Sequence, residues 1–425
     1  MFVHQASDTS LRMASALSAS AETTRAAELV CDQCEGQLGE HPDLVFVFFS
    51  QHHVEFASEI SETVRRRLSP GCLIGVSTVA AIADTTELES SPGISLLAAR
   101  APGVRISPFS SDMLPAWDGD ELSRTRFSEI FGGGPDHRAA FFFADPFSTP
   151  LIKLLPAMNE ARGEGAASPI LGGLASASQS PGGNAMLLND RVLRSGAVGV
   201  SLLGNVRVDT IVSQGCRAFG PNLVITKSQR NLIFELGGKP ALEAVSEAIE
   251  ALPGEQREGL RSGLFIGRVI DEYKSRFGRG DFLIRNVVGV DHNRGAIAVA
   301  EPVHVGQTIR LHMRDAATAH EDLALLLDAQ RLYDPPAGVL LVTCNGRGRR
   351  LFGVPNHDAA AVARAFAGPV PGETLAKPGK AIEPPGAPPV PLAGCFANGE
   401  IGPVGGRSFV HGHTACMALF RPGDR

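Results

Sequence analysis

One pattern of apolar and small residues occurs twice in this chain, and it limits the folds that the chain can adopt. Its first copy begins with the apolar strand LVFVFFS (Leu44 to Ser50) and ends with GISLLAA (Gly93 to Ala99). Its second copy begins with AAFFFAD (Ala139 to Asp145) and ends with GVSLLG (Gly199 to Gly204), at an offset of 199 − 93 = 106 residues. Repetition in this order indicates an internal duplication.

Each copy predicts the same series of elements. A strand, a helix and a short buried strand are followed by a loop of small residues and a further strand. In the first copy the short strand is CLIG (Cys72 to Gly75), and in the second it lies in PILGGLASAS (Pro169 to Ser178). The turn Pro102-Gly103 predicts a hairpin between 93–99 and 104–109. A fainter third copy runs from Gly338 to Phe420.

The pattern predicts a mixed α/β (α+β) fold in which duplicated strand-helix-strand-loop-hairpin units form sheets covered by helices. A chain of 425 residues exceeds one ordinary core, so we expect two domains. Residues 1–42 form an N-terminal segment and a helix, with an irregular stretch over about 1–20. The two domains are 43–235 and 238–418, separated at Gly237-Gly238, and a proline-rich insertion occupies 368–391.

Composition excludes several classes of function. The net charge of −6 supplies no field that attracts nucleic acid or anionic lipid, so we expect neither partner. The seven cysteines are an odd number, unlike a secreted disulfide framework, and no apolar run has signal-peptide or membrane-span length. We therefore expect reduced thiols and a cytoplasmic protein.

The string CNGRG follows the buried strand that ends near Cys344, and strand ends are where crevices form in open α/β sheets. Asn345 and Arg347 have side chains that can fix a carboxylate or carbonyl. Cys344 would be a nucleophile only with a lowered pKa, so a core cysteine is the better interpretation. An enzyme using Cys344 stays an alternative.

A second candidate segment is FANGEIGPVGG, in which one aromatic, one amide and one carboxylate alternate with glycines after a strand. Glu400 can receive an amine there. Glycine permits a ligand to approach the main chain, so Gly172 and Gly173 are also candidates, with tight turns as the competing interpretation. The residues of this segment that we single out are Phe396, Asn398, Gly399, Glu400 and Gly402.

Four histidines are weak haem candidates, and we predict no other metal site. His52 and His53 lie at the end of the first strand, while His411 and His413 are two residues apart and share a face if the segment is extended. No third ligand lies nearby in the sequence, so surface or satisfied core histidines are the better interpretation.

The chain resembles FIST-domain proteins, which pair a FIST N region with a FIST C region. The resemblance is carried by LIGVSTVAA followed by GISLLAA, by ILGGLASAS followed by GVSLLG, by LLVTCNGRG, and by FANGEIGPVGG followed by HGHTA. It covers about residues 43–235 and 238–418. One departure from the family is the loop VSTVAA after Gly75, where many relatives have a Cys-Ser-Thr-x-Gly-Glu type of string.

This resemblance implies an intracellular sensory protein that binds a small ligand, such as an amino acid or a similar polar metabolite, in signal transduction. It points to Cys344, Asn345, Arg347, Asn398, Gly399, Glu400 and Gly402 as ligand-side positions. A haem-based nitric oxide sensor is the alternative that the family also implies. Because no output segment is visible in the sequence, a separate signalling partner must act in trans. A scaffold that uses the proline-rich insertion is a further alternative.

Overall fold

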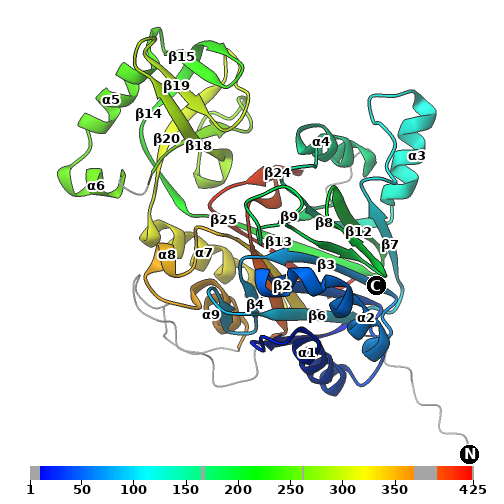
Figure 1. The fold of residues 1–425 in the computed structure, drawn as a ribbon. Coiled ribbons are helices and arrows are strands. Elements are labelled where there is room, and N and C mark those ends of the chain that lie inside the picture. Colours follow the sequence, from blue (N-terminus) through cyan, green and yellow to red (C-terminus); the bar gives the residue numbers. More distant parts are fainter. Residues whose placement is uncertain (1–9, 164–167, 261–262, 368–389, 424–425) are drawn as a thin grey trace, which may run out of the picture.

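A computed structural model describes residues 10–163, 168–260, 263–367 and 390–423. Its sheets and covering helices confirm the predicted mixed α/β class (Figure 1). The predicted insertion falls almost wholly on residues 368–389, which lie outside the described ranges. None of the helices in the described part of the chain combines the length and apolar character needed to cross a bilayer.

Three units of the same design make up most of the fold, which extends the predicted duplication to a triplication. The first unit comprises β1 (Arg12–Ser18), α1 (Thr23–Leu38), β2 (Leu44–Ser50), α2 (Ala57–Leu68), β3 (Cys72–Thr78), β4 (Ala81–Ala83), β5 (Thr86–Leu88) and β6 (Ile94–Arg100). The second comprises β7 (Val104–Ser110), α3 (Glu121–Phe131), β8 (His137–Ala144), α4 (Leu151–Ala161), β9 (Ile170–Leu174), β10 (Met186–Leu188), β11 (Arg191–Leu193) and β12 (Ala197–Gly204).

The third unit comprises β13 (Val206–Gln214), α7 (Ala316–Gln330), β21 (Gly338–Cys344), α8 (Arg349–Phe352), α9 (His357–Phe366), β22 (Leu392–Ala397), β23 (Glu400–Val404), β24 (Arg407–His411) and β25 (Thr414–Pro422). Between β13 and α7 this unit carries a long insertion. The remainder of the unit follows the same order as the other two, so the faint third copy in the sequence corresponds to a real structural repeat.

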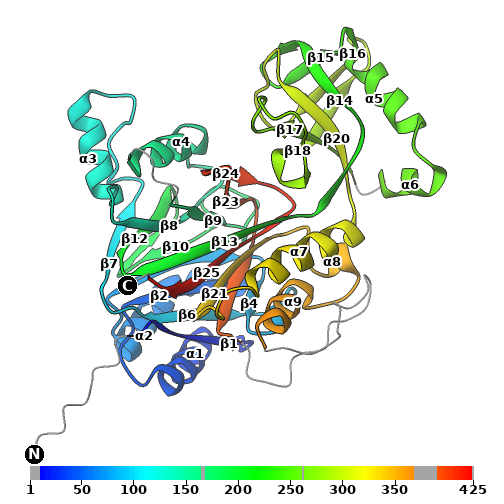
Figure 2. The ribbon, with the colours of Figure 1, turned by 180° about the vertical axis from the view of Figure 1, so that it is seen from behind.

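Each unit forms a sheet around one pair of parallel strands, and the hairpin of each unit pairs with the sheet of another unit. The parallel pairs are β2–β3, β8–β9 and β21–β22, and β6, β12 and β25 run antiparallel beside them. Hairpin β10–β11 pairs with β3, hairpin β23–β24 with β9, and hairpin β4–β5 with β22. The three six-stranded sheets are therefore linked in a closed cycle. Figure 2 shows one of these links, with β23 and β24 beside β9.

Phenylalanines from the three units meet in the centre. The rings of Phe46 (β2) and Phe141 (β8) lie 5.0 Å apart, and Phe420 (β25) lies 6.4 Å from the first and 5.4 Å from the second. All three are buried, within a cluster to which every sheet contributes. The strands are apolar throughout because both sheet faces are covered: in β2, Phe46 and Phe48 face the other sheets, whereas Val45, Val47 and Phe49 pack against α1 and α2.

Three glycines occupy matching positions in the second parallel strand of each unit. Gly75 pairs with Val47, Gly172 with Phe142 and Gly394 with Leu341. A Cβ atom would lie 2.7, 1.9 and 1.7 Å, respectively, from the carbonyl oxygen of that partner. The glycine in each repeat of the sequence is thus required by close approach of two backbones.

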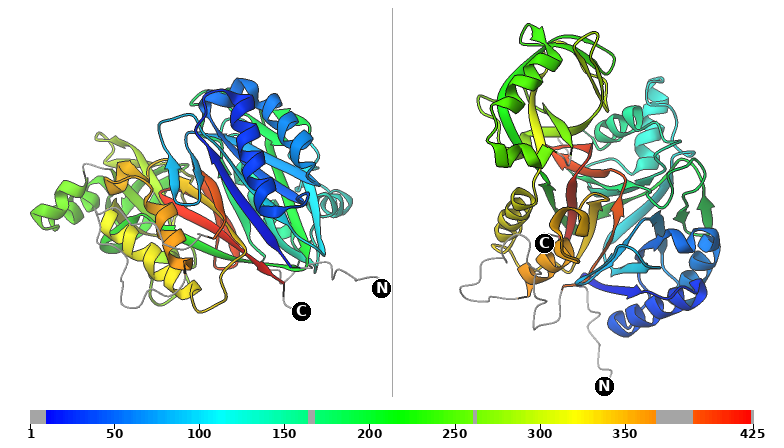
Figure 3. Two further views of the ribbon diagram at one scale, coloured as in Figure 1. Left: turned by 90° about the horizontal axis from the view of Figure 1, so that it is seen from below. Right: turned by 60° about the vertical axis from the view of Figure 1, so that its left-hand side comes forward.

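The insertion between β13 and α7 is a small antiparallel barrel. It contains β14 (Cys216–Gln229), β15 (Leu232–Leu236), β16 (Lys239–Pro240), α5 (Ala241–Glu250), α6 (Gly254–Gly259), β17 (Leu264–Val269), β18 (Phe282–Asp291), β19 (Ala296–Val299) and β20 (Thr308–Arg314). The order β14-β20-β17-β18-β19-β15 closes through the β14–β15 pairing, as the end-on view in Figure 3 shows. The turn Gly237-Gly238 joins β15 to β16 within this barrel.

Two local predictions were wrong. Residues 12–18, expected to be irregular, form β1 and pair with β6 throughout. The predicted hairpin of 93–99 with 104–109 does not form, because β6 pairs with β1 and β2 whereas β7 pairs with β12 in another sheet. The Pro102-Gly103 turn therefore carries the chain from one sheet to the next.

Candidate functional site

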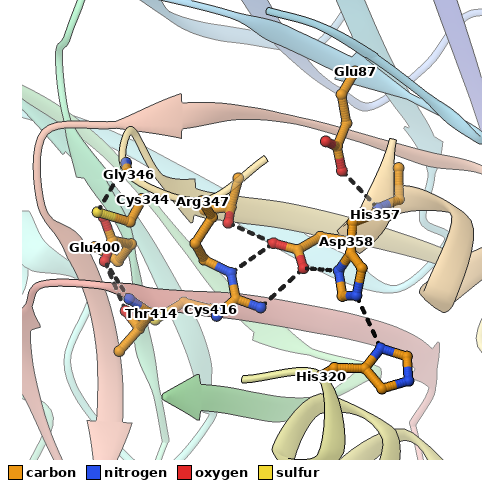
Figure 4. Close-up of polar contacts among 12 residues, drawn as sticks. Glu87, His320, Cys344, Gly346, Arg347, His357, Asp358, Glu400, Thr414 and Cys416 are labelled. Carbon is orange, nitrogen blue, oxygen red and sulfur yellow. Dashed lines mark hydrogen bonds and ion pairs between the residues drawn. The ribbon is translucent and has the colours of Figure 1, made fainter. Parts of the chain in front are cut away.

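The two segments singled out in the sequence, around 345 and around 400, converge beneath the barrel (Figure 4). They meet at the carboxyl end of the parallel pair β21–β22, where open α/β sheets form binding crevices. We call the group Arg314, Cys344, Asn345, Arg347, Glu400 and His413 the interior site. Arg347 and Glu400 are each 0% exposed, whereas Arg314, Cys344, Asn345 and His413 are partly exposed.

Arg347 forms a buried ion pair with Asp358, at the start of α9. Its Nε and Nη2 donate to Oδ2 and Oδ1 of Asp358 at 2.7 and 2.9 Å. Thr343 Oγ1 also donates to Oδ2 at 2.8 Å. Burial alone would raise the pKa of Asp358, but the charge and hydrogen bonds of Arg347 hold that pKa well below its usual value. Both groups are therefore charged at neutral pH.

Two histidines extend this pair toward α7. His357 Nδ1 lies 3.0 Å from Oδ1 of Asp358, and His357 Nε2 lies 2.9 Å from Nδ1 of His320. The His357 ring stacks on Phe352 with centroids 3.4 Å apart. The result is a continuous hydrogen-bonded chain from Arg347 to His320, and its packing holds Asp358 in place.

Glu87 belongs to the first unit and contacts α9 of the third. It lies in the hairpin β4–β5, which pairs with β22. Its Oε1 accepts a hydrogen bond from the backbone N–H of Ala359 at 2.9 Å, and its Oε2 has no partner among the described residues. Burial, reinforced by the nearby charge of Asp358, raises the pKa of Glu87 to about 8. A carboxyl group from one repeat is thus held neutral over most of the physiological range beside an ion pair from another.

Glu400 begins β23 and bonds to the start of β25. Its Oε2 accepts from the backbone N–H of Thr414 at 3.1 Å and from Thr414 Oγ1 at 2.7 Å. Burial raises the pKa of Glu400 to about 8, although Thr414, Arg347 and Cys344 act in the opposite direction. Burial likewise raises the pKa of the Cys344 thiol to about 12, with Glu400 adding to the effect. A thiol with a raised pKa is mostly protonated at neutral pH, which does not favour a nucleophilic Cys344.

The barrel supplies the other wall. Arg314, the last residue of β20, donates through Nη2 to the carbonyl oxygen of Gly346. His413 Nε2 lies 3.0 Å from Asn286 Oδ1 on β18, and its ring packs edge-on against Phe265 with centroids 4.3 Å apart. Burial and the charges of Arg314 and Arg347 lower the pKa of His413 to about 4. The histidine is therefore neutral.

Five polar atoms of the interior site are buried without a hydrogen-bond partner among the described residues. The two that belong to cationic groups are Arg347 Nη1 and Arg314 Nε, and the other three are Glu400 Oε1, Asn345 Oδ1 and His413 Nδ1. Buried polar groups in native proteins are nearly always satisfied, and leaving one unpaired costs roughly 1–3 kcal/mol. Such a concentration of unmet donors and acceptors is typical of a place that receives a polar ligand.

The remaining predicted residues lie near this site but have structural contacts. Phe396 is buried, and its carbonyl oxygen accepts from Ser176 Oγ. Asn398 is exposed and its N–H donates to Leu174. A Cβ on Gly399 would lie 3.1 Å from the Leu174 side chain, and one on Gly402 would lie 2.8 Å from Cys416 Sγ.

Gly172 and Gly173 pair with Ile401 and Glu400 across the β9–β23 ladder. A Cβ on Gly173 would lie 2.9 Å from the side chains of Ala397 and Val342. Both glycines therefore let the hairpin of the third unit settle on the sheet of the second, which positions Glu400.

The four histidines do not converge. His52 is exposed, the buried His53 contacts Thr23 Oγ1 at 2.9 Å, and His411 contacts the Gly402 carbonyl at 2.9 Å. His413 has a φ of +64°, so the segment is not extended and the two rings do not share a face. His53 and His411 are buried and His413 is partly exposed, and each of the three rings already has a protein partner, so these histidines do not fit a haem. Within the described ranges no group of three or more His, Cys, Asp or Glu is arranged to hold a metal ion.

Sequence reasoning missed five residues of this region: Arg314, Glu87, His320, His357 and Asp358. The dipeptide His357-Asp358, shortly after CNGRG, is the one sequence signal for an acidic partner of Arg347. Nothing local marks the others, because they come from another repeat, from α7 and from the barrel.

Comparison with known proteins identifies two domain families. The FIST N domain model matches residues 43–239, and the FIST C domain model matches residues 241–403. The junction between the two matches thus falls inside the barrel, beside β16. FIST domains are associated with sensing in signal transduction.

Relatives of similar length exist in mycobacteria. An uncharacterized protein of Mycobacterium tuberculosis is 35% identical over 397 residues, which is 93% of this chain and 95% of that protein. An uncharacterized protein of Mycobacterium bovis is 35% identical over 384 residues, 90% of this chain and 91% of that protein. A solved structure, T. maritima PurL complexed with ATP, matches over 97% of this chain and 71% of its own at 12% identity, with a TM-score of 0.20. Both domain matches and these relatives show that the chain belongs to the FIST family.

Proposed function

We propose that this protein is a cytoplasmic sensory protein that binds an amino acid, or a similar small metabolite with both a carboxylate and an amine, in the interior site. The observation that carries the proposal is that Arg347, a cation, and Glu400, a carboxyl group, are both fully buried, and that each has one polar atom without a hydrogen-bond partner among the described residues. All seven cysteines are free, which is consistent with a reducing compartment.

The chemistry of the site supports a ligand of this class. A carboxylate placed against Arg347 Nη1 and Arg314 Nε would gain charge-assisted hydrogen bonds from both guanidinium groups. An ammonium group placed against Glu400 Oε1 and Asn345 Oδ1 would donate to a carboxylate and an amide oxygen. Because Asp358 already binds two of the nitrogens of Arg347, the guanidinium is held in a fixed orientation for the third.

Movement of the barrel relative to the three-sheet body would change access to the site, because the barrel and the body each form one wall of it. The barrel is attached at two short segments, around Gly215 after β13 and around Asp315 before α7. Besides these, its contacts include the bond from Arg314 to Gly346 and the bond of Gln214 Nε2 to the Phe282 carbonyl. A ligand that binds the closed arrangement better than the open one would shift the population, and a separate partner in trans would read the barrel position.

A thermal-shift panel tests the proposal. Purified protein is melted with each of the twenty amino acids and with matched compounds that carry only the amine or only the carboxylate. We expect at least one amino acid to raise the melting temperature in a concentration-dependent way and its one-group analogues to have little effect.

Two variants locate the binding. Glu400→Gln keeps the shape of the side chain but cannot ionise, so it should abolish the shift, whereas Glu62→Gln on the exposed face of α2 should retain it. A panel in which no amino acid stabilises the protein, or a shift that survives Glu400→Gln unchanged, would exclude the interior site as the binding site.

A further inference from the structure

A separate open pocket lies in the second unit. It has a volume of about 850 Å³ and is bounded by the segment between β7 and α3, by α3 and α4, and by the turn between β11 and β12. This volume is within the range of roughly 300–1,000 Å³ that is usual for small-molecule sites.

This pocket corresponds in position to the interior site of the third unit. In the second unit Ala197 pairs with Ala144, and in the third unit Ala415 pairs with Thr343, so Ala197 and Ala415 are equivalent residues. Gly196 precedes Ala197 and Thr414 precedes Ala415, so these two residues are also equivalent. Gly196 lines the open pocket, and Thr414 binds Glu400. The barrel inserted after β13 covers the third unit, whereas only the short segment 111–120 follows β7 in the second. The barrel thus covers this sheet end in the third unit, whereas the second unit has an open pocket there.

Most of the wall is apolar. Leu114, Trp117 and Phe127 form one side, and Leu154 and Ala157 on α4 form the other. Trp117 packs edge-on against Phe127, with ring centroids 5.1 Å apart, and its Nε1 donates to Glu160 at 2.9 Å. This wall suits a hydrocarbon or aromatic body, since burying apolar surface is favourable in proportion to its area.

The rim is positively charged where a ligand head group would lie. Lys153, in the first turn of α4, lines the pocket and has no ion-pair or hydrogen-bond partner for its side chain in the described residues. Arg194 lines it too, and its nearest carboxylate is that of the exposed Glu55 at 3.9 Å. Arg191 is neutralised by Asp112 at 2.7 Å, and the acidic Asp118 also lines the pocket. The amino-terminal end of α4 adds a partial positive charge beside Lys153.

We propose that this pocket binds an amphipathic organic anion, a carboxylate on an apolar body, with the body between α3 and α4 and the carboxylate at Lys153 and Arg194. The site is distinct from the interior site and does not depend on it. With this second site, the protein would bind ligands of two chemical classes at two separate places.

Trp117 makes the test direct, because it is the only tryptophan in the chain. We expect decanoate, titrated below the concentration at which it forms micelles, to change the Trp117 emission saturably. The uncharged match 1-decanol should bind more weakly. Lys153→Gln should weaken decanoate about fivefold without altering the affinity for decanol, and Lys227→Gln on the barrel should change neither.

Two further variants test the location of the apolar body. Ala157→Leu fills the pocket and Leu114→Glu places a negative charge in its wall, and either should abolish binding. Leu114 is only partly buried, so the second variant covers the case in which Ala157→Leu does not fold. No saturable emission change, equal affinity for decanoate and decanol, or full binding by a folded Leu114→Glu protein would each overturn the proposal.

Discussion

Arg347 and Asp358 are eleven residues apart in the chain and form a two-point ion pair that is fully buried. The pair joins the turn after β21 to the first turn of α9, and Phe352 contacts both the guanidinium and the adjacent His357 ring. It therefore fixes the geometry of the interior site before any ligand arrives. Variants can separate the free-energy cost of burying this ion pair from the stability that the attraction between its charges contributes.

Asp358→Asn should destabilise the protein by roughly 3–5 kcal/mol, because it leaves the buried charge of Arg347 without a counter-charge. The double variant Arg347→Met, Asp358→Leu should lose less, since it removes both charges from the interior. Urea denaturation measures both differences. Asp328→Asn, whose carboxylate pairs with Arg331 at the exposed end of α7, serves as the control and should have little effect. A double variant less stable than the single one would show that the pair is a net source of stability.

Glu87 and Glu400 should make the protein less stable as pH rises. Burial raises the pKa of each to about 8 from an ordinary 4.5. A carboxyl group with a higher pKa in the folded state binds its proton more tightly there than in the unfolded state. The free energy of unfolding therefore falls as pH rises from about 4.5 to about 8, and it levels off above about pH 8.

The variant Glu87→Gln, Glu400→Gln removes these two ionisations and should flatten the pH profile. Its melting temperature should match that of the natural protein near pH 5 and exceed it near pH 9. Asp358 acts in the opposite direction, because its lowered pKa contributes stability that is lost only in acid. Parallel melting curves for the two proteins from pH 5 to 9 would contradict the assigned pKa shifts.

Gly172→Ala and Gly394→Ala should each prevent correct folding. The added Cβ would lie 1.9 and 1.7 Å from a backbone carbonyl oxygen of the neighbouring parallel strand, and neither strand can move without disturbing the sheet. Gly36→Ala is the matched control: it lies within α1 with nothing near its Cβ position, and it should stabilise the protein by about 0.5–1 kcal/mol. Soluble expression and circular dichroism distinguish these outcomes, and a normally folded Gly394→Ala protein would contradict the required strand approach.

Cys344 should react slowly with iodoacetamide. Burial raises the pKa of its thiol to about 12, so almost none is thiolate at pH 7.5. Mass spectrometry of the native protein should find this cysteine largely unmodified, whereas unfolding in urea should make all seven reactive. Rapid labelling of Cys344 in the native state would restore the alternative of a catalytic cysteine.

Local pattern in the sequence predicted many of the elements correctly. The residue pattern over 150–162 predicts a helix, which is α4, and the pattern from Pro240 to Leu252 predicts another, which is α5. The residues from Phe282 to Val303 predict two strands, which are β18 and β19. Apolar runs and glycine or proline breaks are local features, so they report local structure well. Thr318 and Glu321 predict a helix that starts at Thr318, but α7 begins two residues earlier, because Asp315 accepts from the N–H of Ala317 and caps it.

Partner strands could not be predicted in the same way. Nothing in the residues 93–109 distinguishes a hairpin from a crossover between sheets, because both need a turn and two apolar strands. The exchange of hairpins among the units is likewise set by distant surfaces. It places Glu87 of the first unit against α9 of the third.

By itself, the sequence determined the repeated unit, the mixed α/β class, the family, and the polar segments at 344–347 and 396–402, because periodicity and residue type are local properties. Only the tertiary structure decided that these segments meet, that Asp358 neutralises Arg347, and that the barrel covers one sheet end while its counterpart has an open pocket. These outcomes depend on burial and on contacts between residues far apart in the chain. Both arise only when the three units close on one another.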